Sequence, residues 1–188
     1  MLESITLDQS EVSAEIDAYI HHVCLGKQGV FEYGEQLRCE IVNNNLLKIY
    51  DGLFINQGRF NRIVPGTYEE IKIANGVVGS TRYDLIVSHF ETDGINETHD
   101  IRVIQGDDEG NIPSLQTGDT FNGATVNELL LYTVKLDGIN IKSVTKGFDT
   151  ISQLRKYMSV VSKGEGTITV EFDVVWCWLT GGKNMNEN

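Results

Sequence analysis

Proline and cysteine are scarce in this chain, and each scarcity narrows the possible structures. Only two of the 188 residues are proline, so most turns have to be made with asparagine or with the 19 glycines. The three cysteines, Cys24, Cys39 and Cys177, are far apart and form no CxxC pair. An odd, scattered set of this kind favours reduced thiols packed in the interior over a disulfide framework or a metal site.

The sequence also lacks long apolar runs and an excess of basic residues. No stretch approaches the roughly 20 apolar residues that cross a bilayer. The first ten residues have neither the basic start nor the apolar centre of a signal peptide, so we expect no membrane span and no export by such a signal. The 27 acidic residues outnumber the 15 lysines and arginines, for a formal net charge of −12. An acidic surface repels phosphate backbones, which argues against nucleic-acid binding.

Short apolar and β-branched segments fill residues 30–105, where we expect a β core. Four dipeptides of a kind that favours tight turns separate the segments between residues 46 and 90. They are Asp51-Gly52, Gln57-Gly58, Pro65-Gly66 and Asn75-Gly76. Because tight connections join antiparallel neighbours, this pattern predicts an antiparallel meander. Residues 36–41 also alternate as a strand does, with Leu37, Cys39 and Ile41 facing inward.

Residues 82–90 form the most informative strand. A period of two leaves both of its faces mostly apolar, which is typical of a central strand covered on both sides, and residues 97–105 complete a hairpin with it. Arg82 and Asp84 are then charges at the end of a buried strand and need partners, since an unpaired buried charge is very costly. We expect a structural ion pair that fixes the preceding turn.

Two segments have helical spacing. Residues 8–25 place Val12, Ile16, Tyr19, Ile20 and Val23 on one stripe, with a capping box at Asp8 and Glu11 and a stop at Gly26. We expect this stripe to pack on the sheet or on a neighbouring subunit. Residues 148–161 have the same spacing and predict a second helix.

The remaining segments complete a single structural unit over residues 1–188. A polar loop is expected at residues 106–123, followed by a second β group at residues 124–188 with a hairpin around Asp137-Gly138. The last strand, residues 167–179, becomes apolar on both faces in its second half. It either enters the core or meets another subunit, and the interface candidates are Val174, Val175, Trp176, Trp178 and Leu179. The predicted fold class is β-dominated α+β, a sandwich or barrel-like core with two helices.

No catalytic, cofactor or metal site emerges from the pattern of residues. There is no GxSxG motif, and the four histidines, at positions 21, 22, 89 and 99, have no obvious partner set. Asp107, Asp108, Glu109 and Asn111 do not have EF-hand spacing and lack its closing glutamate. We therefore expect a solvated loop there.

Several short motifs, in order, resemble a family of small tail-associated structural proteins of tailed bacteriophages and prophages, chiefly of Gram-positive hosts. The first is an Asp-Ala pair in the N-terminal helix, Asp17-Ala18. A Gly-containing hairpin follows at Asp51-Gly52 and Gln57-Gly58-Arg59, and then a strand motif in which Asn75-Gly76 and Gly79 precede Arg82 and Asp84–Val87. The resemblance covers about residues 5–106.

This resemblance implies a virion part made in the bacterial cytoplasm and located at the tail tip or baseplate. Such proteins typically form symmetric homo-oligomers that mount neighbouring tail or receptor-binding parts. On this view Gly52, Gly58, Gly76 and Gly79 set turns, Arg82 and Asp84 lock a strand, and no cofactor is needed.

Two alternatives remain at this point. A carbohydrate-binding module would use Tyr68, Tyr83, Trp176 or Trp178, and a row of exposed aromatic rings would favour it. A hydrolase would need His89 or His99 beside a perturbed carboxylate in a pocket.

Overall fold

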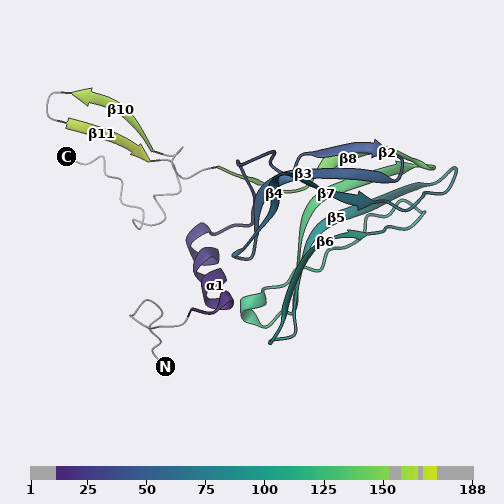
Figure 1. The fold of residues 1–188 in the computed structure, drawn as a ribbon, viewed down its shortest axis with the longest axis horizontal. Coiled ribbons are helices and arrows are strands. Elements are labelled where there is room, and N and C mark those ends of the chain that lie inside the picture. Colours follow the sequence, from purple (N-terminus) through teal and green to yellow (C-terminus); the bar gives the residue numbers. More distant parts are fainter. Residues whose placement is uncertain (1–11, 153–157, 165–166, 173–188) are drawn as a thin grey trace. The chain divides into compact units, whose positions relative to one another are not determined.

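The computed structural model describes residues 12–152, 158–164 and 167–172 (Figure 1). It divides into two compact units, Met1–Ile151 and Ser152–Asn188, where the sequence predicts one. Strands dominate the described residues, with one α-helix near the N-terminus, and the β-dominated fold class is confirmed. The interface candidates at residues 174–179 lie outside the described residues.

The first sheet of unit 1 is built around its long strand β3 (Leu46–Asn56). On one side β3 pairs with β2 (Cys39–Asn43) and β1 (Gly29–Phe31), and on the other with β4 (Arg59–Lys72). All of these pairings are antiparallel. Strand β9 (Thr150–Ile151) joins the edge of β1 in parallel, so the end of the unit returns to its beginning.

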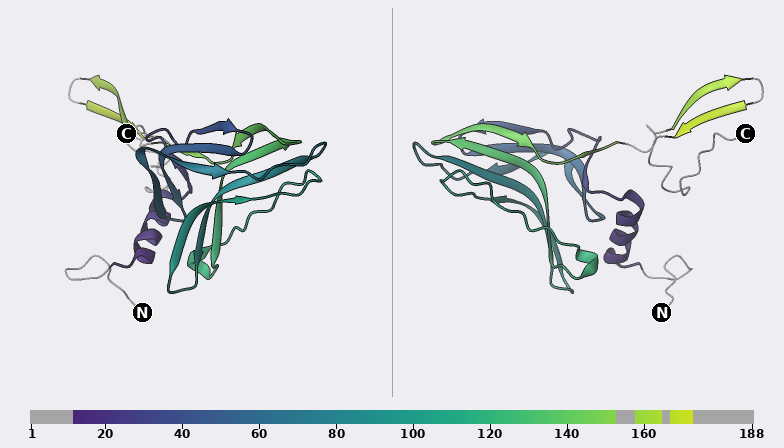
Figure 2. Two further views of the ribbon diagram at one scale, coloured as in Figure 1. Left: turned by 45° about the vertical axis from the view of Figure 1, so that its right-hand side comes forward. Right: turned by 180° about the vertical axis from the view of Figure 1, so that it is seen from behind.

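The second sheet has the order β6-β5-β7-β8, with every pair antiparallel. Its strands are β5 (Thr81–Thr92), β6 (Glu97–Ile104), β7 (Val126–Asp137) and β8 (Asn140–Lys146). The predicted central strand and the two predicted hairpins are confirmed. The register of β5 and β7 shifts between Ile86 and Val87, and such a bulge increases the local bend and twist. Figure 2 shows the strong curvature of this sheet from two sides.

Three of the four predicted turns are wrong, and the predicted meander does not continue from β4 to β5. Asn75-Gly76 lies in the connection of residues 73–80, where the turn is made by residues 77–80 and the chain passes from one sheet to the other. Asp51-Gly52 lies inside β3 and Pro65-Gly66 inside β4, where the register between the two strands shifts. The Asp51 carboxylate accepts hydrogen bonds from the backbone N–H groups of Glu35 and Gly66, both at 3.0 Å, and so stabilises this bulge. A turn dipeptide can thus mark an irregularity within a strand: Gly66 has a φ of 77°, and Gly52 lets the backbone of Leu37 approach closely.

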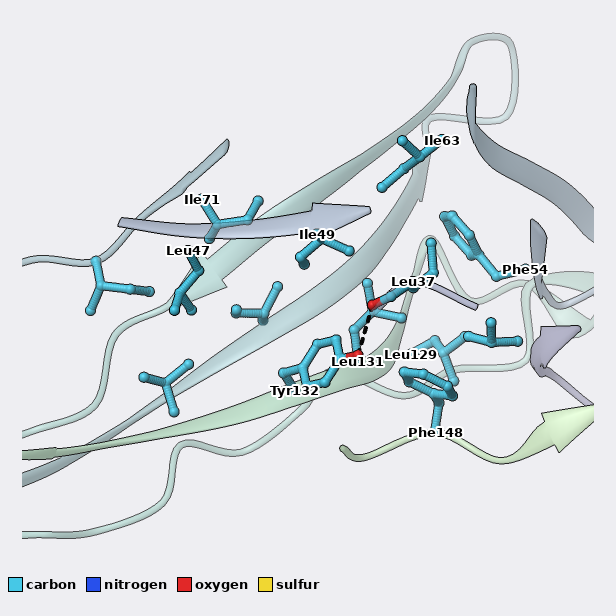
Figure 3. Packing of buried hydrophobic residues seen from close by; sticks show 14 of the residues in the cluster. Leu37, Leu47, Ile49, Phe54, Ile63, Ile71, Leu129, Leu131, Tyr132 and Phe148 are labelled. Atoms are coloured by element: carbon cyan, nitrogen blue, oxygen red, sulfur yellow. Dashed lines mark hydrogen bonds between the residues drawn. The ribbon is translucent and has the colours of Figure 1, made fainter. Parts of the chain in front are cut away.

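The core lies between the two sheets (Figure 3). Leu37, Ile49, Leu131 and Val134 are fully buried in it. Leu37 reaches the core from a turn, with a φ of 56°, rather than from the strand predicted at residues 36–41. The buried Tyr132 hydroxyl donates to the Leu37 carbonyl at 2.7 Å and holds this turn on the core. Ile41, predicted to face inward, is 46% exposed.

Helix α1 (Ala14–Leu25) is shorter than predicted. Its N-cap is Ser13, whose hydroxyl accepts from the Ile16 N–H at 3.2 Å. The predicted capping box of Asp8 and Glu11 lies outside the described residues. Gly26 ends the helix as expected, with a φ of 64°. Ala18, and not the predicted stripe, is its buried residue. Tyr19 and Val23 of that stripe are more than half exposed, whereas Ile16 and Ile20 are half-buried.

The second unit contains an antiparallel hairpin of β10 (Met158–Gly164) and β11 (Thr167–Phe172). The helix predicted at residues 148–161 is therefore wrong at both of its described ends, since Thr150–Ile151 and Met158–Gly164 are strands. The β-branched residues in these segments favour extended backbone and outweigh the apolar spacing. Among the described residues, no helix has both the length and the apolar character to cross a membrane.

Candidate functional site

The polar residues inside the sandwich form the first candidate site, which we call the inter-sheet network. It consists of Asn56, Asn61, Ser88, His99 and Asn127, from strands of both sheets. Asn56 is fully buried at the end of β3 and donates to the carbonyl of Ser88 at 3.1 Å and to that of Asn127 at 3.3 Å. The Asn127 amide donates in return to the Asn56 side-chain oxygen. The network therefore joins β3 to β5 and β7 by hydrogen bonds, which buried polar groups need.

His99 of β6 ends the network on its more open side. Its Nε2 lies 2.6 Å from the Ser88 hydroxyl and its Nδ1 lies 2.9 Å from the Asn61 side-chain nitrogen. Burial lowers the pKa of His99 from 6.5 to about 4, because desolvation disfavours the charged imidazolium. The ring is therefore neutral at pH 7 and carries one proton.

The hydrogen bonds of Asn61 fix which nitrogen carries that proton. Asn61 also donates to the carbonyl of Arg59 at 3.1 Å, so its NH₂ group faces two acceptors, and His99 Nδ1 is one of them. With the Asn61 NH₂ group turned toward Nδ1, as its bond to Arg59 assigns it, the proton resides on Nε2 and points at Ser88.

The three side chains Ser88, His99 and Asn61 have the connectivity of a nucleophile triad but the wrong proton arrangement. In a triad the histidine Nε2 accepts the serine proton. Here Nε2 donates instead, and Ser88 is fully buried, where no substrate reaches its hydroxyl. This arrangement can fix the spacing of the two sheets and gives Ser88 no general base.

A second polar cluster brings together His89 and Glu128. Their Nδ1 and Oε1 atoms are 2.9 Å apart, and both side chains are over nine-tenths buried. The other Glu128 oxygen accepts the backbone N–H of Gln116 at 2.6 Å, so the cluster fastens the segment 106–123 to β7. That segment was predicted as a solvated loop, yet Gly106 and Gly118 also donate to side chains of the second sheet. Neither His89 nor Glu128 lines a described cavity.

The predicted structural residues lie apart from both clusters. Arg82 and Asp84 form a buried bidentate pair, and Arg82 also donates to the backbone carbonyls of residues 74 and 75 before β5. Gly58 forms the β3–β4 turn against the backbone of Ala18, and Gly76 lies against the backbone of Gly138; both approaches are too close for a side chain. Gly52 sits at the β3 bulge and Gly79 in the loop before β5.

Two of the clefts on the described part of unit 1 lie beside the inter-sheet network. The larger, about 540 Å³, lies between the start of α1, the β5–β6 turn and the 3₁₀ turn η1 (Thr120–Asn122). Arg59 lines it, but its guanidinium already pairs with Glu97 and covers the ring of Phe90 at 3.9 Å. The other, about 390 Å³, lies between β4 and β6, and Asn61 and His99 are at its wall.

The residues considered for sugar or metal binding are not brought together. Tyr68 lies on β4 in the first sheet and Tyr83 on β5 in the second, so they form no common row, and Trp176 and Trp178 lie outside the described residues. The Tyr68 ring is covered by the Lys48 ammonium at 3.9 Å. Within the described ranges, no group of three or more His, Cys, Asp or Glu side chains is placed to hold a metal ion.

No protein-family model matches the chain, and no curated protein matches it either.

The inter-sheet network was not predicted from the sequence. Its signal would have been polar residues at inward positions of otherwise apolar strand faces, such as Ser88 between Ile86 and Phe90 on one face of β5. That signal does not reveal which polar residues meet across the two sheets.

Proposed function

We propose that this chain is a non-catalytic structural protein of a phage or prophage tail, a tail-tip or baseplate component that forms a symmetric homo-oligomer and mounts neighbouring tail or receptor-binding parts. The proposal starts from the ordered motifs of residues 5–106 that resemble such proteins. On this proposal the protein is made in the bacterial cytoplasm and acts in the virion.

One observation carries the proposal: the residues of those motifs bridge distant segments of the chain. Gln57 accepts from Thr120 at 2.9 Å, and Arg59 pairs with Glu97. Asp84 accepts the backbone N–H of Gly106, which follows β6, at 3.0 Å. Side chains used in this way give a rigid body, which suits a part that has to keep its shape in an assembly. The proton arrangement of His99 and Ser88, in which His99 donates to the serine hydroxyl, supports a non-catalytic role.

Two measurements test the proposal. Light scattering of the purified protein should give a mass that is a multiple of the 21.0 kDa chain, with three or six copies. Antibodies against the protein should label one end of the tails in electron micrographs of particles from the host, and should not label particles made without its gene. A monomer at tens of micromolar together with unlabelled tails would sink the proposal.

A further inference from the structure

The cleft lies between β4, an edge strand of the first sheet, and β6, an edge strand of the second sheet. β4 pairs with β3 and β6 pairs with β5, and neither strand has a second partner among the described strands. Side chains join the two strands at one end, where Asn61 contacts His99 and Arg59 pairs with Glu97. Beyond that end the cleft of about 390 Å³ opens, with unpaired strand edges on both sides. An unpaired edge is a template for another strand.

The lining of this cleft combines an apolar floor with acidic walls. The apolar residues are the half-buried Ile101 and three residues of the core, Phe54, Ile63 and Ile71, which are at most 7% exposed. Three acidic residues, Glu69, Glu70 and Asp100, outnumber the one arginine, Arg62, and the neutral His99 adds no positive charge at pH 7.

Glu69 is the acid placed to meet an incoming group. It pairs across β3 with the core residue Ile49, so its side chain is on the inward side of the sheet. Asp100 already pairs with Arg102 at 2.8 Å, whereas Glu69 makes no ion pair within the described part of the chain.

The two edges do not offer the same opportunity for pairing. β4 contains Pro65, which has no N–H group, and its residues 64–67 are out of register with β3. Proline, bulges and charges protect an edge from pairing. β6 has no proline and no register shift in its pairing with β5, so it is the edge that can accept a strand.

We propose that this cleft binds an extended segment of a neighbouring protein, which pairs with the free edge of β6 and places a lysine or arginine against Glu69. Apolar side chains of that segment pack on the half-buried Ile101. Strand addition of this kind takes affinity from main-chain hydrogen bonds and specificity from alternate side chains. As an attachment point for another tail part, the cleft rests on the proposed function.

Labelled, capped heptapeptides test the proposal by fluorescence anisotropy. The probe is Ser-Val-Thr-Lys-Thr-Val-Ser, whose valines and lysine share one face of a strand. It should bind more tightly than the same peptide with glutamate for lysine. Two methylated versions of the peptide are then compared: one carries N-methyl groups at Val, Lys and Val, and the other carries them at the two Thr residues. Alternate N–H groups face opposite sides of a strand, so one version should lose binding and the other should keep it. Equal effects of the two methylation patterns would rule out strand pairing.

Protein variants locate the charge. Glu69→Gln should weaken binding of the lysine peptide about two- to five-fold, the range of a partly exposed ion pair. Glu109→Gln makes the same change of charge on an exposed loop residue outside the cleft and should leave the affinity unchanged. Equal affinities of wild type and Glu69→Gln would overturn the proposal. So would an absence of peptide binding, and the oligomer mass and tail labelling would still report on the proposed function separately.

Discussion

Arg82 and Asp84 face each other two residues apart on β5, with two nitrogen–oxygen distances of 2.9 Å and both side chains almost fully buried. The arginine also holds the carbonyls of Ala74 and Asn75, and the aspartate accepts the backbone N–H of Gly106 at 3.0 Å. One ion pair thus fixes the segments on both sides of the β5–β6 hairpin.

Asp84→Ala should destabilise unit 1 by about 3–5 kcal/mol, because it leaves the Arg82 charge buried without its partner. Asp100→Ala is the matched control, since Asp100 and Arg102 have the same two-residue spacing on β6 but are about half exposed. The control should cost at most about 1 kcal/mol. Urea unfolding measures both changes. Equal losses of unfolding free energy would show that burial does not determine how much the ion pair stabilises the protein.

Gly58→Ala should loosen α1 from the first sheet. Gly58 has a φ of 78°, and a Cβ there would collide with the carbonyl oxygen of Ala18 in α1. Gly66→Ala is the control, because Gly66 has a φ of 77° and open space around its Cβ position. Both variants carry backbone strain of about 1 kcal/mol. Only Gly58→Ala should also make α1 sensitive to limited proteolysis, and equal cleavage of the two variants would contradict the close packing.

The stability of unit 1 should fall on acidification between pH 6.5 and 4 through His99. The native pKa of His99 is lowered to about 4 by burial, whereas the unfolded value is 6.5. The unfolded chain therefore binds more protons in this window, and linkage makes stability decrease as the pH falls. The loss at pH 4.5 relative to pH 7 should be about 2–3 kcal/mol for this group.

His99→Gln isolates that contribution, because glutamine does not titrate. Urea unfolding at pH 7 and at pH 4.5 should show a smaller acid-induced loss for the variant than for wild type, by that same 2–3 kcal/mol. Parallel losses in the two proteins would mean that His99 is not held neutral in the native state.

Local signals in the sequence predicted much of the sheet structure. The alternation through residues 82–90 identified β5, and Asp137-Gly138 located the β7–β8 turn. Both signals depend on neighbours in the chain. The buried pair of Arg82 and Asp84 was predictable for the same reason, since two residues apart on a strand means the same face.

Features that depend on tertiary contacts were not predictable in this way. Whether Asp51-Gly52 turns or bulges depends on β4 lying beside β3 over its whole length. Helix α1 lies with the backbone of Ala18 against Gly58 of the β3–β4 turn, and its apolar stripe does not reveal this tertiary contact. Likewise, Asn56 and Ser88 meet only when the two sheets pack face to face.

The parallel pairing of β1 with β9 constrains how the protein folds during synthesis. Val30 is the register partner of Thr150, so about 120 residues separate the two strands in the chain. Contacts with so large a sequence separation form late and slow folding. On the ribosome the first sheet cannot be completed before residue 151 has emerged, and until then the free edge of β1 is open to pairing with other nascent chains.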